Sequence, residues 1–540
     1  MTSIDKTSNI NKSIKIILIS FILIQPLLDT HYLFSEKVIG ILGVSPSTVI
    51  RFFTIALLFI LTFYTLLKED KLSEKYYYFI GYFIFVGIYF LIHHLNAIRL
   101  ESLVPGNFNY SISSELNYIL VLLLPFFITF ITYFADVNDN DFRKTILFLV
   151  ILISGSIVIT NLFKISLSSY DNTRISDNIF SWFGDAYKHY SYFDLASKSF
   201  FNFANQVAAI LCMLLPLTIY FLVVKTDFLS ITSFLLQAIS MLMLGTKVAA
   251  YGFVLILITM FVFYLFFALI KKEFKLSLKT CSCFLCTLAI FLIIFPKSPA
   301  IYKQQIANNT AQKYKYTDTL IEDAEKDDKD DKDDKDDDHD NKKKFYNLNH
   351  DEKVKFIQKY YPQLCINPTF ILNSYPYKYD PDFWYEIMKK PVYQRLNYRF
   401  IEEQMLIRVK EINDNKMDDF FGIGVSRVKN IFNVERDYLN QYYSIGIFGV
   451  LLFLMPFTAI LLLGGYMCLR HYKDKFTFAN ISLLSAIALP QFAAFYSGNT
   501  IDALFTSLIL GFVCGIFLKN IYNEDGFSSN ENISDNANLQ

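Results

Sequence analysis

A polar stretch at residues 422–441 gathers the side chains of this chain that could do chemistry. Gly422 and Gly424 allow a tight backbone turn there. Glu435 and Asp437 follow, just before a long apolar run. A carboxylate beside cations at a membrane surface can take the proton of a hydroxyl group. Charges in this position can also do no more than solvate a helix end, so the rest of the chain has to decide.

The same region is rich in cations. Arg427 follows the two glycines, and Arg395 and Arg399 lie upstream in residues 393–412, which we expect to form a helix. Four residues apart on a helix, Arg395 and Arg399 would share one face. Arginine binds phosphate oxygens with two donors in a fixed geometry, and fixed cations stabilise a departing diphosphate most strongly in the transition state. The set therefore suits chemistry on a lipid-linked diphosphate.

The chain has 540 residues, of which 53% are hydrophobic and 17% aromatic, a composition typical of a polytopic membrane protein. Lys plus Arg equals Asp plus Glu at 50 each, so net charge gives no reason to expect a nucleic-acid partner. Cys281, Cys283 and Cys286 are spaced like metal ligands but open an apolar run, where buried thiols are the simpler interpretation. His93 and His94 end another apolar run and are expected at the membrane interface. No metal site, cofactor or nucleotide-binding loop is predicted.

Twelve apolar segments are long enough, or nearly so, to cross a membrane. They are residues 14–28, 47–67, 76–92, 116–134, 145–163, 204–224, 229–245, 248–270, 280–296, 442–469, 476–496 and 501–519. The sequence therefore predicts an all-α polytopic membrane protein of about 12 transmembrane helices, the first of them uncleaved. A large, mainly helical extracytoplasmic loop is expected between spans nine and ten.

Lys and Arg gather in alternate loops, which predicts that the N- and C-termini are both cytoplasmic. The predicted parts are a membrane domain of spans 1–9 (residues 1–296), an extracytoplasmic loop (297–441), a membrane domain of spans 10–12 (442–520) and a disordered cytoplasmic tail (521–540). Within the loop, residues 322–344 repeat Asp-Asp-Lys and are expected to be a disordered insertion. Most of the candidate residues would then lie on the outer face of the membrane.

Several segments, in a shared order along the chain, resemble the O-antigen ligase/polymerase superfamily, particularly its Gram-positive, exopolysaccharide polymerase-like members. They are IQPLLDTHYLF (24–34), FFNFANQVAAILCMLLP (200–216), MLMLGTKVAAYG (241–252) and FGIG…ERDYLNQYYSIGIFG (421–449). Ligase members usually carry an Arg where this chain has Lys247, and lipopolysaccharide ligases a His where it has Glu435 and Asp437. The carboxylate pattern is associated with polymerase-like members.

The resemblance implies roles for individual residues. Glu435 or Asp437 would be the catalytic base. The candidates for holding the diphosphate are Lys247, Arg399, Arg395 and Arg427. The candidates for binding other parts of the substrate are Asn205 and, by their location alone, Arg174 and Lys198.

The resemblance further implies a GT-C-like, inverting glycosyltransferase. It would polymerise undecaprenyl-diphosphate-linked oligosaccharide on the outer face of the bacterial cytoplasmic membrane, for exopolysaccharide, capsule or cell-wall glycan. Its partners would be the lipid bilayer and the flippase and chain-length regulator of the same pathway. One alternative is a ligase that moves finished glycan to another acceptor. The other is a flippase or transporter, which twelve spans also fit, although no repeated halves are visible and few charges lie within the spans.

Overall fold

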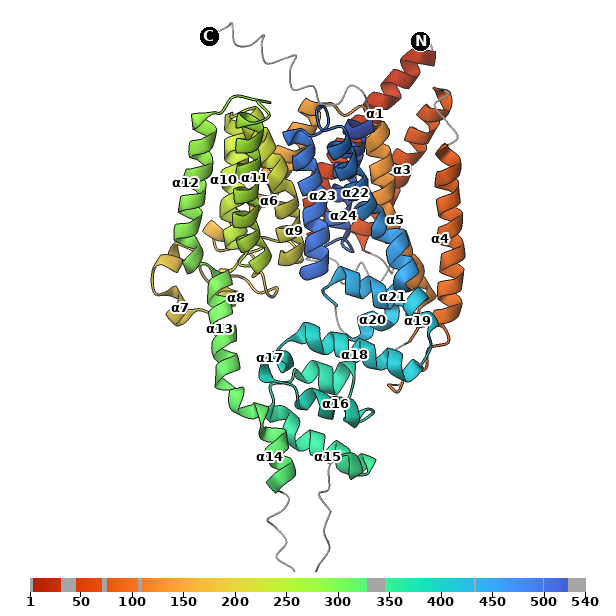
Figure 1. The fold of residues 1–540 in the computed structure, drawn as a ribbon, viewed down its shortest axis with the longest axis vertical. Coiled ribbons are helices and arrows are strands. Elements are labelled where there is room, and N and C mark those ends of the chain that lie inside the picture. The colour runs from red at the N-terminus through yellow and green to blue at the C-terminus, as the bar shows by residue number, and fades with distance from the viewer. Residues whose placement is uncertain are drawn as a thin grey trace, which may run out of the picture. The chain divides into compact units, whose positions relative to one another are not determined.

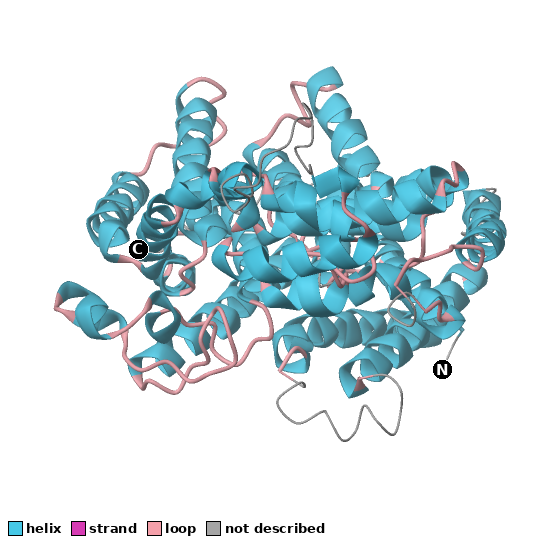
Figure 2. Cartoon of the chain, turned by 90° about the horizontal axis from the view of Figure 1, so that it is seen from below, coloured by secondary structure: helices cyan, strands magenta, loops and turns pink. Residues whose placement is uncertain are grey.

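The computed structural model describes residues 3–30, 45–69, 75–104, 109–327, 345–431, 434–498 and 500–522. Nearly all of these residues form helices or the turns that join them, and no strand occurs among them (Figure 2). The prediction of an all-α polytopic protein is thereby confirmed.

The chain forms two compact units. Unit 1 consists of residues 1–82, 119–303 and 453–540, and unit 2 consists of residues 83–118 and 304–452. Each unit is therefore assembled from segments that are far apart in the sequence.

Unit 1 contains the helices α1 (Ser3–Leu28), α3 (Pro46–Lys68), α6 (Asp139–Leu162), η2 (Ile179–Phe183), α7 (Ala186–His189), α8 (Tyr192–Leu195), α9 (Ala204–Val224), α10 (Phe228–Met243), α11 (Lys247–Leu269), α12 (Leu278–Ile294), η3 (Phe295–Lys297), α22 (Met455–Arg470), α23 (Phe478–Tyr496) and α24 (Leu504–Tyr522). Four further helices contribute residues to both units: α4 (Lys75–Ala97), α5 (Ile112–Phe134), α13 (Pro299–Lys313) and α21 (Asp437–Phe453).

Eleven candidate spans, each helical, long and apolar enough to cross a membrane, occur in the described residues. The seventh of the twelve predicted spans corresponds to the shorter helix α10, of 16 residues. At about 1.5 Å per residue, α10 is roughly 24 Å long, against about 30 Å for the hydrocarbon core of a bilayer.

Helices α9 and α24 lie at the centre of unit 1, because 83% and 89% of their apolar stretches are buried inside the protein. Helix α9 packs against α6, α10, α11 and α23. A glycine lets α24 approach α5 closely, since a Cβ atom on Gly511 would lie 2.4 Å from the carbonyl oxygen of Pro125. Hydropathy alone does not set this arrangement, because α24, with a mean hydropathy of 1.9, is far more buried than α11, with 2.7 and 39% buried.

Unit 2 contains the remaining short helices (Figure 1): η4 (Lys315–Asp318), α14 (Leu320–Asp327), η5 (Phe345–Asn347), α15 (His350–Tyr360), η6 (Tyr361–Gln363), η7 (Thr369–Ser374), α16 (Pro381–Met388), α17 (Val392–Arg395), α18 (Tyr398–Asn413), α19 (Met417–Phe421) and α20 (Val425–Ile431).

Aromatic side chains form the core of unit 2. The rings of Phe345 and Tyr385 stack with their centroids 3.9 Å apart. Trp384 is fully buried, and its indole Nε1–H donates a hydrogen bond of 2.7 Å to the carbonyl oxygen of Tyr375. Buried aromatic residues contribute large apolar areas, so this part of the chain has enough core for a folded piece.

The structure corrects the predicted helix at residues 393–412. The chain breaks between α17 and α18, with Asn397 in an extended conformation before α18 begins. Arg395 and Arg399 therefore belong to different helices, and their predicted shared face is wrong. Arg395, at the end of α17, is buried beside the break, and its guanidinium group bonds to the carbonyl oxygens of Lys390 and Leu364.

The predicted acidic insertion and the predicted tail lie mostly outside the described residues. The acidic run begins within α14, which extends to Asp327, and residues 328–344 are outside the described part. Helix α24 extends to Tyr522, and residues 523–540 are likewise outside it.

Helix α21 is broken at Gly446, whose φ of 68° and ψ of −178° are not helical. The break lies against the turn at Gly422, so two backbone segments are in contact. A Cβ atom on Gly446 would lie 2.3 Å from the carbonyl carbon of Phe420, and one on Gly422 would lie 2.4 Å from that of Ser444. Both positions need glycine for space as well as for backbone conformation.

We expect Gly446→Ala to destabilise unit 2 by at least about 3 kcal/mol, because it adds a backbone clash to an unfavourable φ. Gly87→Ala on α4 is the matched control, since a Cβ atom there meets nothing within 4 Å. The control should change stability by no more than about 1 kcal/mol. Thermal unfolding in detergent can be followed by tryptophan fluorescence. In a Trp182→Phe background, Trp384 reports on unit 2 alone. Equal stability of the two variants would contradict this account of the break.

Candidate functional site

The carbonyl oxygens before the break in α21 accept hydrogen bonds from other segments of the protein. Breaking a helix leaves the carbonyl oxygens of its last turn without partners. Here Tyr443 O accepts the N–H of Ile423 at 2.8 Å, and Ser444 O accepts the N–H of Gly424 at 2.9 Å. The next one, Ile445 O, accepts the hydroxyl group of Tyr89 at 2.5 Å. The turn at residues 422–424 is thus docked onto α21 by hydrogen bonds that a continuous helix could not make.

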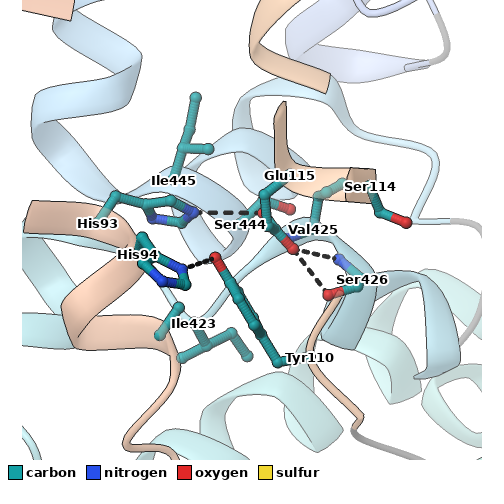
Figure 3. Close-up of polar contacts among 12 residues, drawn as sticks. His93, His94, Tyr110, Ser114, Glu115, Ile423, Val425, Ser426, Ser444 and Ile445 are labelled. Atoms are coloured by element: carbon teal, nitrogen blue, oxygen red, sulfur yellow. Dashed lines mark hydrogen bonds and ion pairs between the residues drawn. The ribbon is translucent and has the colours of Figure 1, made fainter. Parts of the chain in front are cut away.

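Two buried side chains hold the other side of this turn (Figure 3). The carboxylate of Glu115, on α5, accepts the backbone N–H groups of Val425 and Ser426, each at 2.9 Å, and the Ser426 hydroxyl at 2.7 Å. His93, on α4, is 0% exposed. Its Nδ1 lies 2.6 Å from Phe421 O and its Nε2 lies 3.3 Å from Glu115 Oε2. Within unit 2, His93 is thus buried by protein, and its expected position at the membrane interface stays a prediction.

The hydrogen-bond partners set the tautomer of His93. Its Nδ1 must carry a proton, because the carbonyl oxygen of Phe421 can only accept. Its Nε2 faces Oε2 of Glu115, so a proton on Nε2 would let the ring donate to the carboxylate and offset its charge.

Arg427 also belongs to this support. It is 4% exposed, and its Nη1 donates to the carbonyl oxygens of Ala97 and of Ile423, the latter at 3.0 Å. Its guanidinium carbon lies 5.2 Å from the centroid of the Tyr110 ring. Burial lowers the pKa of Arg427, and the nearby negative charge of Glu115 partly offsets this effect. These contacts fit a structural cation better than a diphosphate ligand.

Two further candidates of unit 2, Arg399 and Glu435, belong to a charged cluster where α18 meets the segment that leads into α21. Arg399 donates from Nε to Oε2 of Glu435 at 2.8 Å, and its Nη2 bonds to the same oxygen. Arg436 donates from Nη2 to Glu403 Oε2 at 2.5 Å. The side chains of Arg399 and Glu435 are 33% and 37% exposed. The structure thus brings together one predicted base and one predicted diphosphate ligand, both reachable from solvent.

The remaining unit 2 candidates are buried. Asp437 is the first residue of α21 and is 1% exposed. Arg395 is 0% exposed, and besides two carbonyl oxygens it bonds to the Thr317 hydroxyl and to Asp318. Glu435 and Arg399 are therefore accessible at the surface of unit 2, whereas Asp437 and Arg395 are not.

Unit 1 holds the other four predicted residues, in different settings. Lys247 is exposed and is the first residue of α11, after the tight turn at Gly245. Lys198 is 3% exposed, and its Nζ donates to Asn172 Oδ1 and to Asn202 O. Burial lowers the pKa of Lys198 to about 8. Lys247 is accessible to an anion, while Lys198 links parts of one irregular segment.

Arg174 and Asn205 are also in unit 1. Arg174 is exposed, and its Nε donates to the carbonyl oxygen of Lys164. Asn205 is half-buried and is the second residue of α9, whose N-cap is Phe203. Asn205 is not the residue that caps α9, so helix capping does not explain an asparagine at this position.

Sequence reasoning assigned no role to several residues that the structure brings to these sites: His93, Glu115, Glu402, Glu403 and Arg436. A weak signal existed for two of them, because an ionisable residue inside an apolar span is costly unless it has a partner. The partners themselves, more than 300 residues away in the case of Glu115 and Ser426, leave no local pattern.

The described residues thus combine a polytopic helical bundle with a discontinuous helix and a partly exposed carboxylate–arginine pair outside the apolar spans. A family model described as "O-antigen ligase like membrane protein" matches residues 11–524. The chain therefore belongs to this family, which places it among membrane ligases and polymerases of glycan assembly that act on lipid-linked glycans. The comparison with curated proteins found no match.

We expect His93→Ala to loosen the turn at residues 422–424, because it leaves the buried Glu115 short of a partner. The amides of Val425 and Ser426 should then exchange hydrogen for deuterium about tenfold faster or more. His94→Ala is the control, since the Nδ1 of His94 bonds to the Tyr110 hydroxyl at 2.9 Å and not to Glu115. Unchanged exchange in His93→Ala, measured by mass spectrometry, would show that the turn does not depend on this pair.

Proposed function

We propose that this protein is a polymerase-like glycosyltransferase. It joins oligosaccharide repeat units carried on undecaprenyl diphosphate, on the outer face of the bacterial cytoplasmic membrane, for exopolysaccharide, capsule or cell-wall glycan. Both termini then lie in the cytoplasm, as the distribution of Lys and Arg predicts. The observation that carries the proposal is the ion pair of Arg399 with Glu435.

Glu435 is the better candidate for the base. Its side chain is 37% exposed, whereas Asp437 is 1% exposed. A base must come within hydrogen-bond distance of the proton that it takes. Asp437 also lies at the N-terminus of α21, where the helix dipole favours its charged form and so weakens it as a base.

Arg399 suits a diphosphate because it already holds an anion. In the free protein that anion is the Glu435 carboxylate. An incoming diphosphate competes for the same guanidinium group, which offers several donors in a fixed fork. When Arg399 turns to the phosphate oxygens, Glu435 loses a charged donor and becomes a stronger base. Binding of the donor lipid thereby prepares the base.

The reaction is an inverting displacement. The hydroxyl oxygen of one repeat unit forms a bond to the anomeric carbon of another, and the bond from that carbon to the phosphate oxygen breaks. Glu435 takes the hydroxyl proton, and the lipid diphosphate leaves with the bonding electron pair. Arg399 stabilises the charge that develops on it. Lys247, in unit 1, stays a prediction as a diphosphate ligand.

A transporter is the alternative of another class, and the broken helix bears on it. Transporters use discontinuous helices whose free backbone groups bind substrate or ions. In α21 the carbonyl groups before the break, those of Tyr443, Ser444 and Ile445, accept hydrogen bonds from the protein itself. They are occupied in holding the turn, which supports a positioning role for the break.

We expect Glu435→Gln to reduce chain elongation by about a hundred- to ten-thousand-fold, because the amide cannot take the hydroxyl proton. The assay uses purified protein in detergent with lipid-linked repeat units, and polymer length is read from a gel. Asp382→Asn is the control, since this carboxylate is similarly exposed, at 47%, but pairs with Lys353 elsewhere in unit 2.

Three outcomes discriminate between the functions. Elongation in detergent, where no sealed membrane exists, would exclude a pure transporter. Transfer of finished glycan without elongation would identify a ligase. Neither reaction, together with wild-type behaviour of Glu435→Gln in cells, would overturn the enzyme assignment.

A further inference from the structure

Glu402 is a buried carboxyl group inside the charged cluster of unit 2. It lies on α18 three residues after Arg399, on the same side of the helix, and it is 2% exposed. Its neighbours are paired with one another: Arg399 with Glu435, and Glu403 with Arg436. In the described part of the chain, Glu402 takes part in neither of these ion pairs.

Burial without a partner favours the neutral form of a carboxyl group. Burial, and next to it the negative charge of Glu435, raise the pKa of Glu402 to about 8, although Arg399 and Arg436 oppose the rise. The cations on the helices packed against α18 have other partners. Arg395, on α17, bonds to Asp318, and Arg427, on α20, bonds to the carbonyl oxygen of Ala97. Lys429, also on α20, has its Nζ 5.8 Å from the centroid of the Tyr118 ring.

The other four charges of the cluster cancel, because two arginines face two glutamates. Glu402 therefore decides whether the cluster as a whole is neutral or carries a net negative charge. A net negative charge on the cluster opposes the approach of a diphosphate. An ionised Glu402 also competes with the diphosphate for the two arginines that would neutralise the diphosphate.

We propose that Glu402 is a positioning residue that sets the charge of the Arg399–Glu435 site for its anionic substrate. In its neutral form, it leaves Arg399 available to the diphosphate. Once Glu435 has taken the hydroxyl proton, the cluster becomes positive against the departing lipid diphosphate. In its ionised form, Glu402 pairs with Arg399 or Arg436 and weakens substrate binding. The inference rests on the proposed function, since it assumes a diphosphate at this site.

The direction of the pH effect follows. Below about pH 7, Glu402 is protonated and the site binds the anion; as the pH rises through the pKa of about 8, the carboxyl ionises and binding weakens. The proton on Glu402 also contributes to the stability of the folded protein. Because the folded pKa lies above that of an ordinary glutamate, this contribution is complete at low pH and is lost as the pH rises through the folded pKa.

The experiment measures binding of farnesyl diphosphate to the full-length protein in detergent, by calorimetry, from about pH 6.5 to about pH 9.5. Wild-type affinity should fall by about tenfold for each pH unit above the pKa until the bound-state pKa is reached. In Glu402→Gln, which is neutral throughout, the affinity should stay near its low-pH value. Glu411→Gln on the same helix, whose side chain is 60% exposed, should follow the wild type.

Infrared spectroscopy gives a readout that needs no ligand. At neutral pH the wild type should show a protonated carboxyl C=O band that is missing in Glu402→Gln and that fades as the pH rises. If Glu402→Gln does not fold, Glu402→Met, an apolar side chain of similar length, replaces it in both measurements.

Two results overturn the inference alone: absence of a band that depends on Glu402, or the same pH dependence of binding in wild type and variant. Failure of the wild type to bind farnesyl diphosphate at any pH would count against the proposed function as well. In that case a band that depends on Glu402 would still show that the carboxyl is protonated, so the two failures are distinguishable.

Discussion

The backbone contact between Gly422 and Gly446 is the constraint on which the arrangement of unit 2 depends. It interrupts α21 and exposes the carbonyl groups before the break. The turn at residues 422–424 supplies two of the N–H groups that those carbonyls need, and Tyr89 supplies a hydroxyl. The N-terminal part of α21 is thereby held at a defined place. Glu435 lies two residues before the first residue of α21, so the candidate base is close in sequence to this held segment.

Unit 2 uses its polar residues in two different ways, and exposure separates them. Arg395 and Arg427 are buried, and their guanidinium groups bond largely to backbone carbonyl oxygens. Unpaired polar groups are costly in such surroundings, so these residues keep their partners. Arg399 and Glu435 are about one-third exposed and bond to each other. A surface ion pair of this kind contributes little to stability, so its replacement by another partner would cost the fold little.

The sequence allowed much of the fold to be predicted, because crossing a membrane requires a run of apolar residues of known length. It failed where a single polar contact decides the local structure. The helix expected at residues 393–412 breaks at Asn397, beside the buried Arg395, and the pattern of residues along the sequence does not indicate the break. The support of the glycine turn was missed because Glu115 and Ser426 are 311 residues apart. Glu435 was predicted as a candidate base from its setting beside glycines and cations, whereas nothing in the sequence distinguishes Glu402 from an exposed glutamate of a helix.

A transferase that releases a diphosphate has to manage two charges at once. The acceptor hydroxyl gives up a proton, and the leaving group gains negative charge. A site that is too negative repels the donor lipid, while a site with only cations has no base. Pairing one ionised carboxylate with an arginine, beside a second carboxyl kept neutral by burial, meets both needs. Glu435 is partly exposed and paired with an arginine, which suits a carboxylate that accepts a proton. Glu402 is buried and has a raised pKa, which suits a carboxyl group that keeps its proton. The same side-chain type can thus serve both purposes because the fold exposes one and buries the other.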